Sequence, residues 1–216
     1  MEIRYNGDMS IKAVVFDFGN VICFPPSLEV REGIAALAGI PLEKLEDLHR
    51  QYRGELFDRG TLDCKGYYKT ILEKAGVFPG DEALQRLAEA DVDSWKNMNP
   101  GTEALIREIQ KAGFKLGVLS NMPHDFLAWG RKNIEAFRNA DVGIFSCEFG
   151  MVKPEPGIYQ ALIAALGCKA EEVVFFDDVK DNIEKAVSLG IHGFIWKDPE
   201  TAREDLKKLD PAFAGF

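Results

Sequence analysis

The sequence lacks the main features of membrane-spanning, secreted and nucleic-acid-binding proteins. No apolar run approaches the roughly 20 residues needed to cross a bilayer, and the segment 1–10 has no hydrophobic centre of the kind found in secretion signals. Basic side chains are in the minority, with 26 Lys and Arg against 35 Asp and Glu, and the net charge of −9 repels nucleic acid and anionic lipid. We therefore expect a cytoplasmic protein that binds neither nucleic acid nor membrane.

Cysteine is also scarce. The four cysteines are widely separated, without the close pairs that a zinc cluster or a small disulfide framework requires. We expect buried free thiols at Cys23, Cys64, Cys147 and Cys168. By contrast, hydrophobic residues make up 46% of the 216 residues, which is enough for one large domain or for a core with a smaller companion.

Short, β-branched apolar runs recur along the chain, as is typical of parallel strands covered on both faces. The first run starts at Ile11, and the later ones end at Ser120, Ser146, Phe176 and Trp196. Stretches with helical spacing lie between them, at 99–113, 156–167 and 181–190. This alternation predicts an α/β fold, with a doubly wound, mostly parallel Rossmann-like sheet and helices on both faces.

One interval breaks the alternation. About 80 residues separate the first strand from the helix at 99–113, which is too long for a loop. Three stretches inside it, at 42–52, 68–75 and 84–95, have apolar residues at helical spacing. We therefore expect a helical domain at 23–96, inserted after strand one into a core made of 1–22 and 97–216.

Polar residues follow the predicted strands where ligands collect in an open parallel sheet, outside the carboxyl ends. They are Asp17 after the first strand, Ser120 and Asn121 at the second, Lys153 before the helix at 156–167, and Asp177 and Asp178 at the fourth. Crowded carboxylates repel one another unless a cation lies among them, and a hard divalent ion suits oxygen ligands. We therefore expect Mg²⁺ at this edge.

A carboxylate beside such a cation can attack phosphorus and form an aspartyl-phosphate, which divides one difficult displacement into two easier ones. Asp17 is our expected nucleophile. The cation, Lys153 and Ser120 would hold the phosphoryl oxygens in a fixed geometry, from which phosphoryl transfer gains most of its rate.

Four segments carry a family resemblance. VVFDFGNVI, VLSN, KPEPGIY and VVFFDDVKDNIEKAVSLG resemble, in order, the four motifs of the haloacid dehalogenase superfamily, and the inserted helices resemble its cap domain. Within the superfamily, the first motif is most similar to a bacterial branch reading FD, any residue, GNV. That branch includes phosphatases of sugar 1-phosphates such as α-D-glucose 1-phosphate.

The resemblance implies a role for each matching residue. Asp17 is implied as both nucleophile and Mg²⁺ ligand, and Gly19 as a ligand through its carbonyl. Ser120 is implied to bind the phosphoryl group and Lys153 to neutralise it, while Asp177 and Asp178 complete the metal site with Asn182 in support. We also expect substrate contacts from Asn121 and, from the cap, Arg59.

One position departs from the pattern. Most phosphatases of the superfamily carry a second aspartate two residues after the nucleophile, as acid and then base, whereas this chain has Gly19. General acid catalysis contributes roughly 10²- to 10⁴-fold. His124, Asp58 and Glu55 are candidate substitutes. Alternatively, the leaving group has low basicity, as in a sugar 1-phosphate or an acyl phosphate, and needs little protonation.

We predict a Mg²⁺-dependent phosphatase that acts on a small phosphorylated metabolite, and two alternative functions remain open. A metal-free 2-haloacid dehalogenase would use Asp17, Ser120, Asn121, Lys153 and Tyr159, but the carboxylates at 177 and 178 disfavour it. A phosphometabolite-binding module without turnover would keep the site after losing the second aspartate. The sequence leaves the oligomeric state open.

Overall fold

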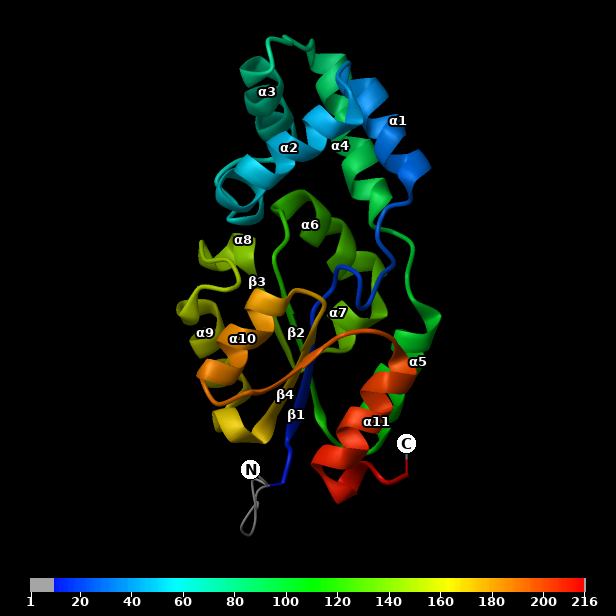
Figure 1. Cartoon of the computed structure of the whole chain (residues 1–216), viewed down its shortest axis with the longest axis vertical. Coiled ribbons are helices and arrows are strands. Elements are labelled where there is room, and N and C mark those ends of the chain that lie inside the picture. The colour runs from blue at the N-terminus through cyan, green and yellow to red at the C-terminus, as the bar shows by residue number, and fades with distance from the viewer. Residues whose placement is uncertain (1–9, 216) are drawn as a thin grey trace.

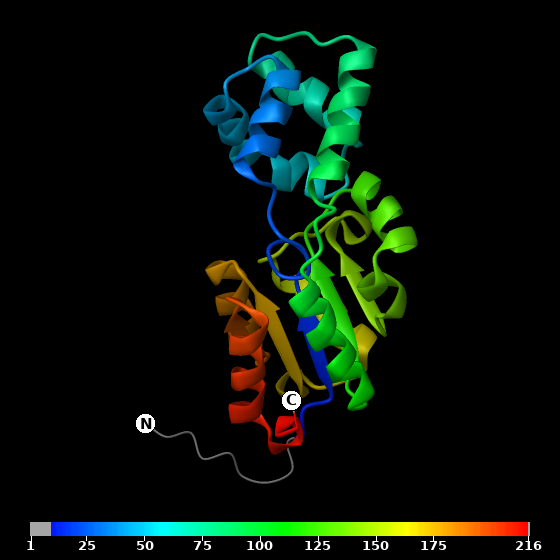
Figure 2. The same ribbon diagram turned by 90° about the vertical axis from the view of Figure 1, so that its right-hand side faces the viewer.

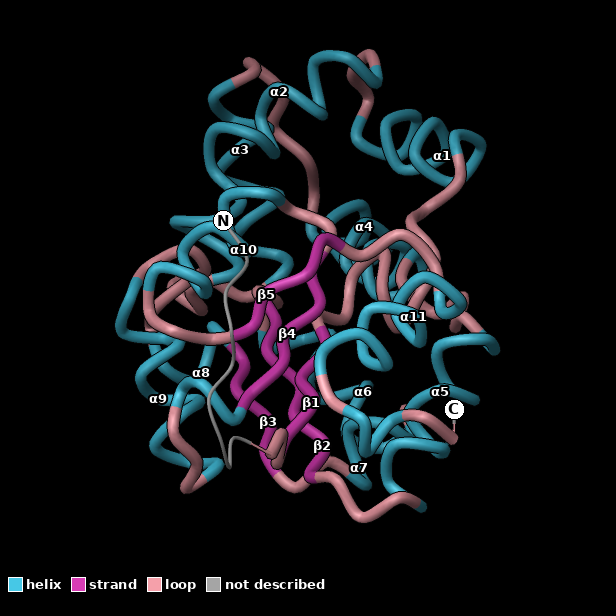
Figure 3. Tube along the Cα trace, turned by 60° about the horizontal axis from the view of Figure 1, so that its bottom comes forward, coloured by secondary structure: helices cyan, strands magenta, loops and turns pink. Residues whose placement is uncertain are grey.

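A computed structural model describes residues 10–215 of the chain. Its centre is a parallel sheet of five strands in the order β3-β2-β1-β4-β5 (Figure 3). The strands are β1 (Ala13–Phe16), β2 (Lys115–Ser120), β3 (Val142–Phe145), β4 (Val173–Asp177) and β5 (His192–Ile195). This arrangement confirms the predicted fold class.

Side-chain alternation along β1 divides the core into two layers. Val14 and Phe16 pack on one face of the sheet, while Ala13 and Val15 pack on the other. Helices α9 (Pro156–Leu166) and α10 (Lys180–Ser188) cover the face of Val15, and helices α5 (Pro100–Lys111), α6 (His124–Asn133), α7 (Glu135–Asn139) and α11 (Pro199–Leu209) cover the face of Phe16. Both faces are thus buried, which explains the nearly continuous apolar character of the strands.

Register brings the ends of three strands together. Phe16 of β1 lies opposite Val118 of β2 and Phe176 of β4. The chain leaves the sheet at Asp17, whose backbone N–H still donates to the Phe176 carbonyl at 2.9 Å. The first strand is therefore shorter than the apolar run 11–18, and its polar end stands beside those of β2 and β4.

A separate layer of helices, apart from those that cover the two faces of the sheet, lies beyond the carboxyl end of the sheet (Figures 1 and 2). It contains α1 (Leu28–Ala38), α2 (Leu42–Tyr52), the π-helical turn η1 (Arg53–Asp58), α3 (Cys64–Lys74) and α4 (Asp81–Ser94). These elements enclose a hydrophobic cluster of their own, which includes Leu45, Tyr67 and Ile71. We call this layer the cap. Its first helix, α1, was not expected from the sequence.

Two connecting segments join the cap to the core and run side by side. The Phe24 N–H donates to the Asn97 carbonyl at 2.8 Å, and the Asn99 N–H donates to the Ile22 carbonyl at 2.9 Å. We place the domain boundaries in these segments, at 22/23 and 96/97, as a proposal. Residues 1–9 of the expected core lie outside the described residues.

All four cysteines are free and buried, as expected. Within residues 10–215, no helix combines the length and the apolar character that crossing a membrane requires.

Candidate active site

A cavity of about 290 Å³ lies between the cap and the carboxyl ends of β1, β2 and β4. Core residues that line it include the predicted Asp17, Gly19, Ser120, Asn121, Lys153 and Asp178. The cap contributes Arg53, Asp58 and Trp95. Segments distant in sequence thus converge where open parallel sheets bind ligands.

Lys153 is the positive centre of the core side. Its ammonium Nζ lies 2.8 Å from Asp17 Oδ1 and 2.6 Å from Asp177 Oδ2, and it donates to the Leu119 carbonyl at 3.0 Å. The side chain is only 1% exposed. Burial alone would lower the pKa of Lys153, but the adjacent Asp17 and Asp177 carboxylates raise it, so the ammonium stays charged.

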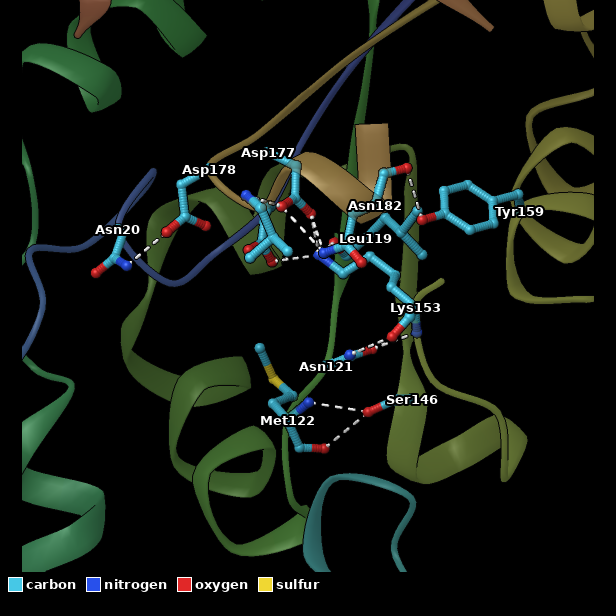
Figure 4. Close-up of polar contacts among 12 residues, drawn as sticks. Asn20, Leu119, Asn121, Met122, Ser146, Lys153, Tyr159, Asp177, Asp178 and Asn182 are labelled. Atoms are coloured by element: carbon cyan, nitrogen blue, oxygen red, sulfur yellow. Dashed lines mark hydrogen bonds and ion pairs between the residues drawn. The ribbon is translucent and has the colours of Figure 1, made fainter. Parts of the chain in front are cut away.

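Asp177 is held on all sides rather than exposed to the cavity. Its oxygens accept two hydrogen bonds from Asn182 Nδ2, both at 3.0 Å, and one from the Val179 N–H at 2.8 Å. The Asn182 carbonyl in turn accepts a hydrogen bond from the Tyr159 hydroxyl (Figure 4). This network fixes the carboxylate that orients Lys153.

Asp178 lies on the accessible side of the pair. Its Oδ2 accepts a hydrogen bond of 2.6 Å from Asn20 Nδ2, and Asn20 takes a positive φ of 59° in the turn after β1 (Figure 4). Asp17, Asp177 and Asp178 each place one carboxylate oxygen within 4.8 Å of the others. Among residues 10–215, Lys153 is the only basic side chain that pairs with these three carboxylates, so two formal negative charges remain, which matches the charge and oxygen preference of one divalent cation.

Burial has a marked effect on Asp17. It raises the pKa of this carboxyl to about 6; Lys153 opposes the shift and Asp177 adds to it. A nucleophile is most useful as the carboxylate, and positive charge placed beside Asp17 favours that form. The geometry therefore fits a bound cation.

Ser120 ends β2 at the cavity, and Asn121 follows it directly. Ser120 is 2% exposed and lines the cavity. Asn121 is also part of the scaffold, because its side chain accepts from the Lys153 N–H at 2.8 Å and donates to the Lys153 carbonyl at 3.1 Å (Figure 4). These two bonds fix the loop that carries the ammonium.

Gly19 lies beneath the cap. A Cβ atom added there would stand 3.4 Å from Cζ3 of the Trp95 ring. The Trp95 indole thus lies next to position 19, where most phosphatases of the superfamily carry a second aspartate and where this chain has no acid.

The turn η1 supplies two charged groups to the cavity. Its i→i+5 hydrogen bonding, as from the Arg59 N–H to the Gly54 carbonyl, places residues five apart on one side. Arg53 Nε accordingly lies 3.3 Å from Asp58 Oδ1. Arg53 was not among the predicted site residues, although its spacing of four from His49 and eight from Leu45 puts it on the inward face of the α2 pattern.

The other predicted cap and loop residues lie elsewhere. Arg59 is not among the residues lining the cavity; it bonds to Glu155 at 2.6 Å and to the Gly150 carbonyl at 2.8 Å. Glu55 pairs with Arg59 on the exposed side, and His124 lies beside Gly60, outside the cavity lining. A substrate contact by Arg59 stays a prediction.

Comparison with known proteins defines the family. Residues 11–190 match the haloacid dehalogenase-like hydrolases. The chain belongs to this family of hydrolases. The predicted superfamily resemblance is thus confirmed.

The chain is also similar to individual proteins, at low sequence identity. The chain is 29% identical to "Phosphatase MT3486" of Mycobacterium tuberculosis, over 87% of this chain and 88% of the relative. It is 26% identical to "Phosphorylated carbohydrates phosphatase" of Thermotoga maritima, over 84% and 82%. The fold is similar to that of the HAD family enzyme bt-2542 of Bacteroides thetaiotaomicron in complex with magnesium and inorganic phosphate, with a TM-score of 0.71 at 20% identity, over 88% of this chain and 96% of that one.

Proposed function

We propose that this protein is a Mg²⁺-dependent phosphatase that hydrolyses the phosphate monoester of a small metabolite through an aspartyl-phosphate on Asp17. The observation that carries the proposal is the position of the Asp17 carboxylate at the cavity, 2.8 Å from a buried ammonium and within 4.8 Å of two further carboxylates. The names of the two relatives and the bound magnesium and phosphate of the bt-2542 enzyme support it.

The donor set suits magnesium. Asp17 and Asp178 offer carboxylate oxygens from the cavity wall, Gly19 is our proposed carbonyl ligand, and Asp177 lies behind them. When bound, Mg²⁺ would supply positive charge for the phosphoryl oxygens and favour the Asp17 carboxylate. Asn182 and Asn20, which bond to the acidic pair, would keep these ligands in position.

The reaction then follows from the positions of the side chains. The Asp17 carboxylate attacks phosphorus, and the bond from phosphorus to the leaving oxygen breaks. Lys153 and Ser120 hold the phosphoryl oxygens. Water next attacks the phosphorus of the aspartyl-phosphate, which releases inorganic phosphate and restores Asp17.

The cap limits the size of the substrate. The cavity of about 290 Å³ lies at the lower end of the range for small-molecule sites, and its cap side combines the charged Arg53 and Asp58 with the Trp95 ring. A compact polar substrate fits these walls. We propose a sugar phosphate, with a sugar 1-phosphate as the first candidate because of the FD-x-GNV form of the first motif.

The proposed location rests on the cysteines, and the proposed partner rests on the reaction. Four free, buried thiols suit a reducing compartment, and we propose the cytoplasm. The partner is then a small phosphorylated metabolite.

The test is a phosphate-release screen of sugar 1-phosphates, sugar 6-phosphates and acyl phosphates, with Mg²⁺ and with a chelator, beside Asp17→Asn. We expect release that requires Mg²⁺ and is lost in Asp17→Asn. Halide release from 2-haloacids in the presence of chelator would instead identify a dehalogenase. Tight binding of phosphorylated compounds without any release would identify a binding module.

A further inference from the structure

Asp58 occupies a distinctive position in the cap. It ends the π-helical turn η1 and lines the same cavity as Asp17, although its side chain is only 13% exposed. Of the three acids and bases that the sequence offered in place of an aspartate at position 19, it alone lines this cavity. Glu55 has a side chain that is 70% exposed and pairs with Arg59.

Several contacts hold the end of η1 against the core. The Ser146 hydroxyl donates to the Asp58 carbonyl. The Ser146 hydroxyl oxygen also accepts from the Met122 N–H at 2.9 Å (Figure 4). Gly60 packs so closely against α8 (Ser146–Phe149) that an added Cβ would stand 2.6 Å from the Cys147 carbonyl oxygen. The backbone of Asp58 is thus fixed to the loop that follows Ser120.

The carboxyl group of Asp58 is not fully satisfied by these contacts. Its Oδ1 lies 3.3 Å from Arg53 Nε but accepts no hydrogen bond from any of residues 10–215. Arg53 divides its charge between Asp58 and Asp91, which is 3.4 Å from its Nη1. An imperfectly paired carboxyl group at the wall of a catalytic cavity is a candidate for proton transfer.

We propose that Asp58 is the proton donor and acceptor of the phosphatase reaction, acting from the cap in place of the aspartate absent at position 19. The proposal rests on the proposed function. In the first step, the Asp17 oxygen bonds to phosphorus, the phosphorus–oxygen bond to the leaving group breaks, and the Asp58 carboxylic acid donates its proton to that oxygen. In the second step, the Asp58 carboxylate accepts a proton from the attacking water, phosphate departs, and both aspartates return to their initial states.

The charges that face Asp58 are compatible with both states. Burial raises the pKa of Asp58, while Arg53 on its own turn and Lys153 from the core oppose the shift and Asp91 on α4 adds to it. The opposing effects let the group hold a proton for the leaving oxygen and release it before water attacks.

Since the donor belongs to the cap, the acid reaches the leaving group only while η1 is seated on α8. This arrangement couples the closure of the cap to chemistry.

The experiment compares Asp58→Asn with wild type on two substrates of similar shape, p-nitrophenyl phosphate and phenyl phosphate, both with Mg²⁺. The leaving group of phenyl phosphate is the more basic of the two. We expect Asp58→Asn to lower kcat/KM on phenyl phosphate by about 10²- to 10⁴-fold, with a much smaller loss on p-nitrophenyl phosphate. We also expect the variant to accumulate enzyme that carries one covalent phosphoryl group, detected by mass spectrometry after acid quench, because water loses its base.

Two control variants separate proton transfer from support of the fold. Glu55→Gln should behave as wild type. Asp91→Asn removes the other carboxylate beside Arg53, so any loss that it causes should be equal on both substrates. Equal losses on both substrates in Asp58→Asn, or no loss, would overturn the proposal while leaving the phosphatase function intact. By contrast, absence of any release by wild type would remove the proposed function itself.

Discussion

The Lys153 ammonium and the Asp177 carboxylate form a buried ion pair of 2.6 Å, with side chains that are 1% and 0% exposed. Such a pair is strongly destabilising to break, because the remaining charge stays buried without compensation. Two strands and a loop far apart in sequence depend on it, since Lys153 also contacts Asp17 at the end of β1.

Replacement of Lys153 should therefore affect both stability and activity. We expect Lys153→Met to lower the free energy of unfolding by about 3–5 kcal/mol and to abolish phosphate release. Urea denaturation followed by circular dichroism measures the first effect. As a control, Lys180→Met removes an exposed pair with Glu184 and should leave the free energy of unfolding nearly unchanged. A Lys153→Met protein as stable as wild type would contradict the role of this pair.

Asp178 should control the affinity for the metal. It is the more accessible of the adjacent acidic residues and holds no ion pair with Lys153 in the described chain. We expect Asp178→Asn to raise the Mg²⁺ concentration that gives half-maximal activity by at least about 10- to 100-fold, since even outer-shell partners of metal ligands contribute that much. Asp181→Asn, an exposed change in the next helix, should leave this concentration unchanged. Equal Mg²⁺ requirements in the two variants would argue against Asp178 as a ligand.

Most of the core part of the site was predicted from the sequence because several of its polar residues end an apolar run, whereas Lys153 was predicted from its place before the helix at 156–167. Asp17, Ser120 and Asp177 interrupt β-branched strands, and parallel strands end at one edge. A strand that is buried on both faces gives a simple pattern, and the side chain that breaks it is easily found.

The cap part could not be predicted in the same way. The π-helical turn after α2 changes the angular spacing of the side chains, so the α-helical pattern that predicts α2 reaches Arg53 but does not say where Asp58 points. Trp95 was not among the predicted site residues, although it lines the cavity above Gly19. Helix α1 was missed because only Ile34, Ala35 and Ala38 are buried along it, which leaves a weak apolar face.

The stability of the cap should depend on pH through His49. Burial, with help from Arg53, lowers the pKa of His49 to about 4. The unfolded chain binds a proton near pH 6.5, whereas the folded chain does not bind it until the pH is much lower. Stability from this residue is therefore lost as the pH falls from about 6.5 towards 4.

The corresponding experiment compares wild type with His49→Gln by urea denaturation at pH 7.5 and pH 5. We expect wild type to lose about 2 kcal/mol more than the variant between these two values. Because the raised pKa of Asp17 acts in the opposite direction over the same range, the difference between the two proteins is the informative quantity. Parallel losses would show that His49 is protonated as easily in the folded state as in the unfolded one.

Arg59 and Glu155 should act together as a contact between the cap and the core. Arg59 Nη2 lies 2.6 Å from Glu155 Oε1, outside the cavity that holds the predicted nucleophile. Loss of either partner should weaken the packing of η1 against the core by about 1 kcal/mol, which corresponds to a loss of about fivefold in kcat/KM. We expect Arg59→Met and Glu155→Gln to have similar effects, and the double variant to be no worse than either. Lys12→Met, which removes an ion pair with Glu172 near the start of β1, should leave kcat/KM unchanged. If Arg59 instead binds substrate directly, Arg59→Met will raise KM far more than Glu155→Gln does, and the two effects will add.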